Sequence, residues 1–253
     1  MPIAVSVQEA LENRTANSFP EVNTKPFHRR LYFGSEPAQG GTAQDDKKAL
    51  PQAYLIEQAE NSTVLAHFHD TNQFQVFVQG DGAFGKKPFD GLLVHYAKAH
   101  TTYGPIAAGP NGAHYLTLRN NWDSGAKLMP KNRDKLRPIK REHRVAENVH
   151  VPDTTALRSV TLETVDLIPL EQDGLGARQF NIGPGRACTV AFETDGAGAY
   201  AVVVAGSVVH DGAELETQSL IYRGADEAPL TVEAGAEGAS VLLLQFPPEP
   251  DDE

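Results

Sequence analysis

An internal repeat limits the fold of this chain more than any other feature of the sequence. At a constant offset of 126 positions, the segments at 75–80, 91–96 and 107–118 (QVFVQG, GLLVHY and AAGPNGAHYLTL) align with those at 201–206, 217–222 and 233–244 (AVVVAG, TQSLIY and EAGAEGASVLLL). The gapless overlay of 75–119 keeps 11 identities in 45 positions, against roughly three expected from ordinary composition. A register that never slips predicts two copies of one module.

Both copies have the pattern of short β-strands. TVLAHFH, FQVFVQG, GLLVHYA and AHYLTLR in the first copy, and CTVAFET, YAVVVAGSVV and SVLLLQF in the second, run or alternate apolar between turn residues. The matched positions include turn-type glycines, Gly80 with Gly206 and Gly112 with Gly238. Even spacing of short strands predicts an all-β sandwich or barrel. Only residues 7–17, VQEALENRTAN, have helical character.

The overall composition excludes several classes of function. The 253 residues carry 22 Lys and Arg against 33 Asp and Glu, a net charge of −11, which argues against nucleic acid or an anionic membrane as the main partner. No apolar run approaches the ~18 residues of a membrane span, and the start MPIAVSVQEALEN lacks the pattern of a secretory signal. The single cysteine, Cys188, excludes an intramolecular disulfide and is expected to be a buried apolar residue. These features predict a cytoplasmic protein.

A basic segment separates the two copies. Residues 127–144 hold eight Lys and Arg against Asp134 and Glu142, a charge of +6. A solvated linker that packs on acidic faces is the favoured interpretation, and a rim that steers anions toward a site is the other. The predicted organisation is therefore an N-terminal domain with its arm, a basic linker, a C-terminal domain and an acidic tail, at 1–126, 127–150, 151–247 and 248–253.

Histidines concentrate in the first copy. Five of the nine histidines fall between residues 67 and 114. His67 and His69 are two residues apart, so on a strand both imidazoles point to the same face. Gln73 follows four residues after His69, and Gly80 ends that strand.

The segment HFHDTNQFQVFVQG resembles the first signature of the cupin superfamily. In that signature H-x-H is followed by three residues, Glu, six residues and Gly, and His67, His69 and Gly80 match in type and spacing. Gln73 stands where most members carry a metal-binding Glu. The whole chain resembles a bicupin, with two tandem jelly-roll barrels. The resemblance covers about 45–120, and about 155–247 through the repeat. It implies a divalent metal bound by His67, His69 and Gln73.

The resemblance also implies a third imidazole, for which three positions compete. His100 follows the Asp90-Gly91 turn and the strand LLVHYAKA, and it is favoured. His114 in GPNGAH is a rival, but it opens the segment that the repeat aligns with the last strand of the second copy. His95 is the third possibility.

The second copy lacks these side chains. At the positions of His67, His69, Gln73, His100 and His114 it carries Glu193, Asp195, Ala199, Asp226 and Ser240. The N-terminal domain is therefore predicted to bind the metal and the C-terminal domain to be structural.

A shell of three imidazoles and one carboxamide would be neutral, so a divalent ion would keep its full charge. Such a site would favour a small anionic chelating substrate such as an enolate, catecholate, thiolate or carboxylate. Fe(II) is favoured by similarity to three-histidine cupin dioxygenases, while Zn, Ni, Cu and Mn are possible. Gln73 cannot act as a general base. Candidates for proton transfer or substrate binding are Tyr103, Tyr115, His95 and Arg119.

The predicted function is thus a metal-dependent bicupin enzyme, foremost a non-haem Fe(II) dioxygenase of a small anionic molecule. The alternatives are a non-oxidative metal-dependent isomerase, lyase or hydrolase, and a cupin that binds a metal or small ligand without catalysis. A homodimer is possible, since barrels associate through exposed edge strands.

Overall fold

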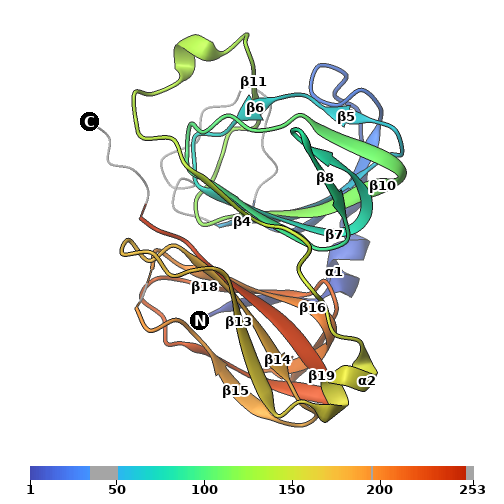
Figure 1. The fold of residues 1–253 in the computed structure, drawn as a ribbon, viewed down its shortest axis with the longest axis vertical. Helices are drawn as coiled ribbons and strands as arrows, with labels where there is room; N and C mark the ends of the chain where they lie inside the picture. Colours follow the sequence, from blue (N-terminus) through green and yellow to red (C-terminus); the bar gives the residue numbers. More distant parts are fainter. Residues whose placement is uncertain (35–50, 195, 249–253) are drawn as a thin grey trace. The chain divides into compact units, whose positions relative to one another are not determined.

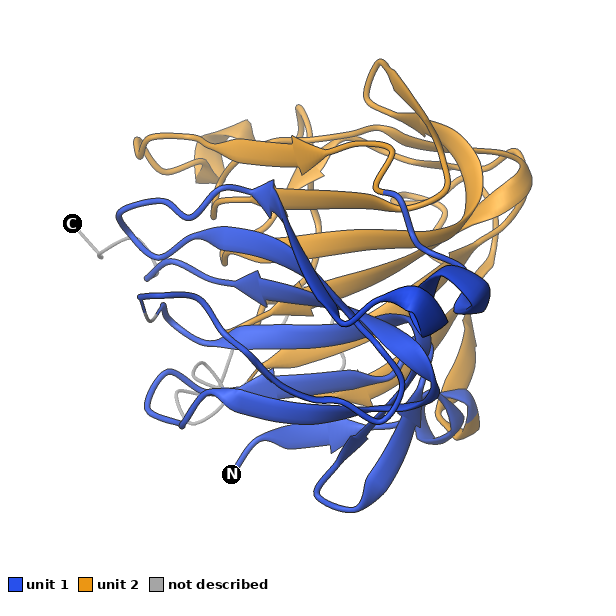
Figure 2. Cartoon of the chain, turned by 60° about the horizontal axis from the view of Figure 1, so that its bottom comes forward, with its two compact units in different colours: residues 1–11, 150–248 blue, residues 12–149, 249–253 orange. Residues whose placement is uncertain are grey.

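The computed structural model describes residues 1–34, 51–194 and 196–248, which form two compact units. We call Glu12–Val149 the N-terminal unit, and Met1–Leu11 with His150–Pro248 the C-terminal unit (Figure 2). Both units consist mainly of antiparallel strands, which confirms the predicted all-β class with a short N-terminal helix. Asp195 and residues 249–253 of the predicted tail lie outside the described residues.

The N-terminal unit is built on one long antiparallel sheet (Figure 1). Its strand order is β12-β9-β7-β10-β4-β3-β2, with β5 on β10 and β8 on β7, and β6 and β11 form a separate two-stranded sheet. The bounds are β2 Arg14–Asn17, β3 Phe27–Phe33, β4 Gln52–Gln58, β5 Thr63–Val64, β6 His67–Phe68, β7 Gln73–Phe84, β8 Lys87–Asp90, β9 Leu93–Ala97, β10 Ile106–Arg119, β11 Lys127–Leu128 and β12 His143–Ala146, with a 3-10 turn at Arg133–Lys135.

The C-terminal unit has the sheet order β1-β18-β16-β19-β14-β13, with β15 on β19 and β17 on β16. Its bounds are β1 Ile3–Val5, α1 Val7–Glu12, α2 Thr154–Ser159, β13 Leu162–Ile168, β14 Gly176–Ile182, β15 Ala187–Val190, β16 Ala199–His210, β17 Ala213–Glu216, β18 Leu220–Arg223 and β19 Leu230–Gln245. The N-terminal arm joins this unit because β1 pairs with β18.

The strand pairings repeat with the sequence. Strands β7 and β8 lie 126 positions before β16 and β17, and β7 pairs with β8, β9 and β10 as β16 pairs with β17, β18 and β19. A Cβ atom on Gly80 would lie 2.1 Å from the carbonyl oxygen of Gly112, and one on Gly206 would lie 2.0 Å from that of Gly238. Gly80 and Gly206 also have φ of +90° and +66°, which L side chains rarely adopt. The glycine matches therefore mark the same close backbone approach in both units.

The two units differ in what fills them. The core of the C-terminal unit is a cluster of aliphatic residues with Phe180 and Cys188, so the predicted burial of Cys188 is confirmed. The core cluster of the N-terminal unit contains three tyrosines, Tyr54, Tyr103 and Tyr115. Among the described residues, the core cluster of the C-terminal unit contains no tyrosine.

The predicted helix over 7–17 is too long. The helix α1 ends at Glu12, and residues Arg14–Asn17 form β2, which pairs with β3. Ser6 caps α1, because its backbone N–H donates to Oε2 of Glu9 at 2.8 Å and its Oγ accepts from the backbone N–H of Glu9 at 3.2 Å. Beyond the helix, the Arg14 guanidinium binds the Glu57 carboxylate on β4. Tertiary pairing thus overrides the local helical pattern.

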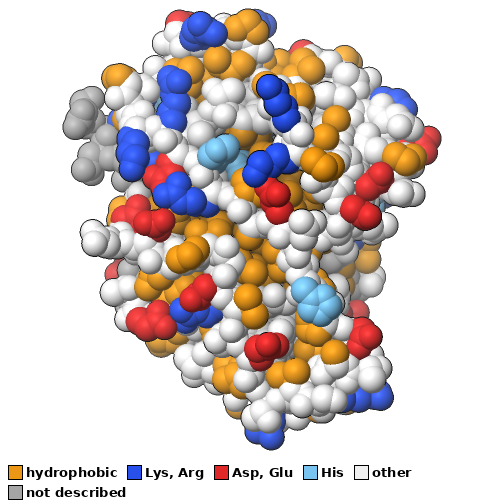
Figure 3. All heavy atoms as spheres, in the orientation of Figure 1, with side chains coloured by type: hydrophobic (Ala, Val, Ile, Leu, Met, Phe, Trp, Pro, Cys, Tyr) orange, Lys and Arg blue, Asp and Glu red, His pale blue; other side chains and the backbone are white. Residues whose placement is uncertain are grey.

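The basic segment is not a separate linker. Strand β11 pairs with β6, the strand that carries His67, and β12 pairs with β9. Residues 127–149 therefore belong to the N-terminal unit. Figure 3 shows Lys and Arg side chains gathered over this part of the chain. Among the described residues, no helix has the length and apolar character needed to cross a membrane.

Candidate active site

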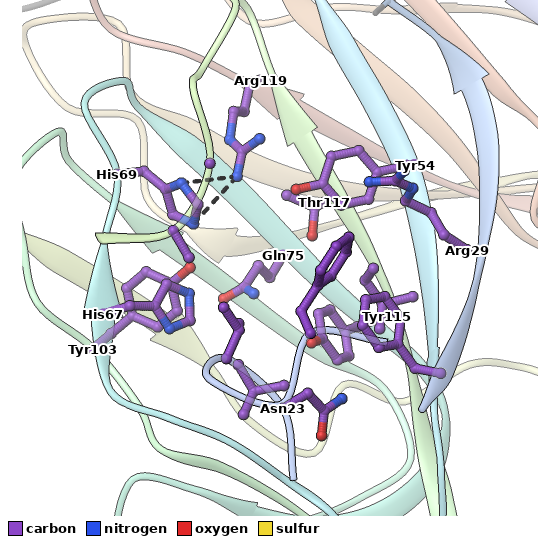
Figure 4. Close-up of a pocket in the computed structure, with 17 residues that line it drawn as sticks. Asn23, Arg29, Tyr54, His67, His69, Gln75, Tyr103, Tyr115, Thr117 and Arg119 are labelled. Atoms are coloured by element: carbon purple, nitrogen blue, oxygen red, sulfur yellow. Dashed lines mark hydrogen bonds between the residues drawn. The ribbon is translucent and has the colours of Figure 1, made fainter. Parts of the chain in front are cut away.

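The N-terminal unit contains a pocket of about 740 Å³ of empty space, counting its open mouth. Tyr115, Thr117 and Arg119 line it from β10, because residues two apart on a strand share one face. Strands β4 and β7 contribute Tyr54 and Gln75. Figure 4 shows these side chains around one hollow.

His67 and His69 enter the pocket together, as their spacing predicts. Both line it, and their ring centroids are 5.1 Å apart. Phe68 between them is fully buried and does not line the pocket. The alternation of the strand thus separates the two imidazoles from the phenyl ring.

Each imidazole is held through Nδ1. The Nδ1 atom of His67 lies 2.6 Å from the carbonyl oxygen of Leu65, and that of His69 lies 2.6 Å from Oδ1 of Asp123. Both partners are acceptors, so Nδ1 carries the proton and Nε2 carries the lone pair. Burial lowers the pKa of His67 to about 3 and also lowers the pKa of His69, against the opposing effect of Asp123. Both rings are therefore neutral at pH 7.

Asp123 anchors this side of the site. Its Oδ2 accepts from the backbone N–H of Asp70 at 2.9 Å, and its Oδ1 accepts from that of Gly125 at 2.7 Å. Burial alone would raise the pKa of this carboxyl, but His69 and Arg119 lower it well below its usual range. Asp123 is therefore a buried carboxylate ion.

Arg119 is a fully buried cation at the end of β10. Its Nη1 donates to Oε1 of Gln52 at 2.9 Å, while Nε and Nη2 donate to Oε1 of Gln73 at 3.2 and 3.0 Å. Its Nη2 also lies 3.2 and 3.3 Å from Nδ1 and Nε2 of His69. The carboxylate of Asp123 lies close by, with Oδ1 3.9 Å from Nη1 of Arg119.

Tyr103 completes the cluster. Its backbone pairs with His67, its ring centroid lies 4.6 Å from that of His67, and its hydroxyl accepts a hydrogen bond from Nε2 of Gln73. Burial raises the pKa of Tyr103 above its ordinary value. Because the hydroxyl oxygen accepts from Gln73, the phenolic proton can be donated to another group.

His100, the favoured third imidazole, is not among the described residues that line the pocket. Its Nε2 lies 4.0 Å from Oδ1 of Asp70, and its ring centroid lies 5.6 Å from that of Phe68. It therefore packs against the side chain that faces away from the pocket. Its backbone N–H donates to the carbonyl of His69 at 2.8 Å, so its main chain contacts the segment that carries the two pocket imidazoles.

The two alternative candidates for the third imidazole, His114 and His95, differ in their distance from this cluster. His114 lines a different hollow, beside Glu57. His95 is fully buried, with Nδ1 3.1 Å from Oε1 of Gln75 and its ring centroid 5.1 Å from that of Tyr103. Its Nε2 has no hydrogen-bond partner among the described residues. Of the three candidates for the third imidazole, His95 is the one whose ring contacts a member of the cluster.

The cluster does not fit a resident divalent metal. In the described part of the chain, no three His, Cys, Asp or Glu side chains are arranged to hold one. Of the predicted donors, Oε1 of Gln73 accepts two bonds from Arg119, and Nε2 of His69 lies 3.3 Å from the same guanidinium. A divalent ion bound to these atoms would lie directly against a buried positive charge.

Sequence reasoning named Tyr103, Tyr115, His95 and Arg119 but missed several residues of this site. Asp123 follows β10, Gln52 is the first residue of β4, and neither belongs to a motif. The series Tyr115, Thr117 and Arg119 has the alternation of a pocket-facing strand edge, which could have been recognised.

Comparison with known proteins gives the fold. No family model and no curated protein matches the chain. Among solved structures, it is similar to a provisionally assigned dioxygenase of Nostoc punctiforme, with TM-score 0.60, 10% identity, and 96% of this chain and 82% of that chain covered. The nickel(II) complex of the pirin YhhW of Escherichia coli gives TM-score 0.55 and 12% identity, with 98% and 100% covered. The fold is a cupin fold.

A third similar structure is a variant of the salicylate 1,2-dioxygenase of Pseudoaminobacter salicylatoxidans in complex with gentisate. It gives TM-score 0.52 and 12% identity, with 96% of this chain and 81% of that chain covered. At these identities the likeness concerns the cupin fold, and the chemistry of this chain must be argued from its own pocket.

Proposed function

We propose that the pocket of the N-terminal unit is the substrate site of a cupin-type enzyme, and that the substrate is a small planar hydroxylated carboxylate. The observation that carries this proposal is the pair of buried arginines in the pocket wall. Arg29 and Arg119 are 5% and 0% exposed, and their Cζ atoms lie 5.7 and 5.5 Å from the ring centroid of Tyr54. The described lining of the pocket contains these two cations and no carboxylate.

The positive charge of the pocket favours an anion. The histidines are neutral, and Asp123 lies behind the pocket wall rather than in it. In a site shielded from water, a guanidinium recognises a carboxylate through charge and paired N–H donors. The predicted small anionic substrate is therefore retained as part of the proposal.

The remaining walls favour a flat body with a hydroxyl group. The pocket is lined by five aromatic rings of Phe and Tyr: Phe19, Phe27, Tyr54, Tyr103 and Tyr115. Aromatic walls hold planar ligands by stacking and edge contacts. The Nε2 lone pair of His67 can accept a hydrogen bond from a ligand hydroxyl, and the Tyr103 hydroxyl can donate one. Gentisate, the ligand in one of the similar structures, is an aromatic hydroxy acid of this kind.

Calorimetric titration with 2-hydroxybenzoate and 2-hydroxybenzamide tests the proposal. The two molecules have nearly the same shape, but only the first is an anion. The anion should bind at least ten times more tightly, and Arg29→Met should remove most of that preference. The matched control is Arg178→Met, because Arg178 lies over the ring of Phe192 in the C-terminal unit, and it should leave binding unchanged. Equal affinity for the anion and the amide, or no binding of either, would contradict the proposal.

A metal-dependent dioxygenase is the second candidate. It is favoured by the anchoring of both imidazoles through Nδ1, which is the arrangement that orients histidine ligands in metal sites. The similar solved structures include enzymes named as dioxygenases. This function requires Arg119 to leave Gln73 and His69. Oxygen uptake by protein supplied with Fe(II) and 2-hydroxybenzoate tests it, and activity that persists under argon with Zn or Ni would favour a non-oxidative reaction instead.

We also propose that the C-terminal unit is a structural copy of the same barrel. At the positions of Gln73 and Arg119 it carries Ala199 and Gln245, and its core cluster is apolar. A cytoplasmic location and a homodimer remain predictions from the sequence.

A further inference from the structure

We infer that Arg119 is the resident cation of the N-terminal unit, and that its guanidinium excludes a divalent metal from the site at His67, His69 and Gln73. This inference is independent of the proposed ligand. The contacts of Arg119 take up the atoms that the cupin resemblance assigns to a metal.

The amide oxygen of Gln73 has no capacity left for a metal. Nε and Nη2 of Arg119 donate to it at 3.2 and 3.0 Å, and a carbonyl oxygen has two lone pairs. His69 is engaged on both sides, by Asp123 at Nδ1 and by Nη2 of Arg119 at 3.3 Å from Nε2. A metal would bind these two donors at about 2.0–2.2 Å, so it would overlap with or repel the guanidinium.

Arg119 is built into the barrel rather than placed there by chance. The side chain is 0% exposed, Gln52 accepts from its Nη1 at 2.9 Å, and the Tyr54 ring lies 5.5 Å from its Cζ. Asp123 supplies a fully buried negative charge 3.9 Å away. A long surface side chain can move aside cheaply, but this one would lose a hydrogen-bond network and a counter-charge.

The identity of residue 73 fits the same interpretation. The carboxamide of Gln73 accepts from Arg119 with its oxygen and donates to the Tyr103 hydroxyl with its nitrogen. An ionised Glu could accept from Arg119 but could not donate to Tyr103. The departure from the cupin signature therefore matches a site that holds a guanidinium.

The repeat gives an internal comparison. The position of Arg119 in the C-terminal unit is Gln245, whose Nε2 donates to the carbonyl of Gly174 at 2.8 Å and that of Thr194 at 2.9 Å. The barrel thus folds with a neutral residue at this position. At this repeat position, a cation occurs only in the copy that also has the histidines at the matched positions.

Titration with Co²⁺, followed by calorimetry and by the visible absorption of the bound ion, tests this inference in four proteins. The wild type should show no site with Kd below about 10 µM that depends on His67. Arg119→Met should gain a site that depends on His67 and that binds Co²⁺ at least 100-fold more tightly than the wild type does. His67→Ala in that background should remove this site. Arg119→Lys is the matched control, because it keeps the charge and should gain nothing.

The unmodified protein decides the matter if Arg119→Met does not fold. Stoichiometric, micromolar Co²⁺ binding by the wild type that His67→Ala abolishes would overturn the inference. A folded Arg119→Met with no gain in affinity would overturn it equally. Either failure leaves the anion titration unaffected, so the two proposals fail separately.

Discussion

Nη2 of Arg119 lies 3.0 Å from Oε1 of Gln73, and Nε2 of Gln73 donates onward to the hydroxyl of Tyr103. One carboxamide therefore joins a buried cation to a phenol, and both of these line the pocket. The network explains why a neutral residue with both a donor and an acceptor stands at position 73.

Replacing Gln73 with Leu should destabilise the N-terminal unit by about 2–4 kcal/mol, because a buried guanidinium loses an acceptor. Trp122 is the only tryptophan of the chain, so its fluorescence during urea unfolding reports this unit. Gln58→Leu is the control. Its Nε2 donates only to neutral carbonyls, of Ser62 and Ile106, and the loss should be smaller. Equal losses in the two variants would argue against a special role for the Arg119 contact.

Asp123 and Arg119 should be energetically coupled. Asp123→Asn alone should cost roughly 3–5 kcal/mol, because it leaves a buried guanidinium without its counter-charge. The double variant Arg119→Met/Asp123→Asn should lose less than the sum of the two single variants. The exposed pair Lys87 and Glu147 is the control, and its removal should change stability by less than about 1 kcal/mol. Strict additivity at Arg119 and Asp123 would refute the coupling.

The buried His95 should make the N-terminal unit sensitive to acid. Burial lowers its pKa to about 3 from an ordinary 6.5, and the neighbouring His143 and His67 act in the same direction. Below pH 6.5 the unfolded chain therefore binds a proton that the folded chain does not. The contribution of His95 to the free energy of unfolding is fully present above pH 6.5 and is lost as the pH falls toward 3. At pH 5 the loss is about 2 kcal/mol. His95→Leu should reduce the change in the Trp122 unfolding midpoint between pH 7 and pH 5, while His67, whose pKa is also lowered to about 3, keeps its own contribution. An unchanged pH dependence would contradict this assignment.

The close backbone approach at Gly80 and Gly206 should tolerate no side chain. Alanine at Gly80 would place Cβ 2.1 Å from the Gly112 oxygen, and the expected loss exceeds about 3 kcal/mol since backbone must move. Gly206→Ala should do the same to the C-terminal unit, measured by circular dichroism. Gly212 also has positive φ but open space around it, so Gly212→Ala should cost only about 1 kcal/mol. Equal losses of stability at all three positions would mean that the positive φ angle, rather than the close backbone contact, causes the loss.

The repeat allowed much of the fold to be predicted, because a constant offset of 126 fixes which strands correspond. Local pattern failed where pairing across the chain decides the structure. Residues 14–17 have helical neighbours but pair with β3, and the basic segment after residue 126 pairs with β6 and β9.

The site was partly predictable for a related reason. Alternate residues of a strand share one face, and this rule correctly predicted that His67 and His69 point the same way. The position of His100 depends on a turn where it has φ of +60°, and no short pattern fixes such a turn. Arg119 and Asp123 meet the histidines through folding of segments some 50 residues apart in the chain, so only the structure reveals the internal cation.

The measurement that tests the central claim most directly is the Nε–H resonance of Arg119 in arginine-labelled protein, assigned by its loss in Arg119→Lys. The account predicts a signal protected from exchange at pH 7, shifted by one equivalent of 2-hydroxybenzoate and unchanged by one equivalent of Zn²⁺. A signal that ignores the anion but moves or disappears with stoichiometric Zn²⁺ would show that a metal, not the guanidinium, belongs at this site.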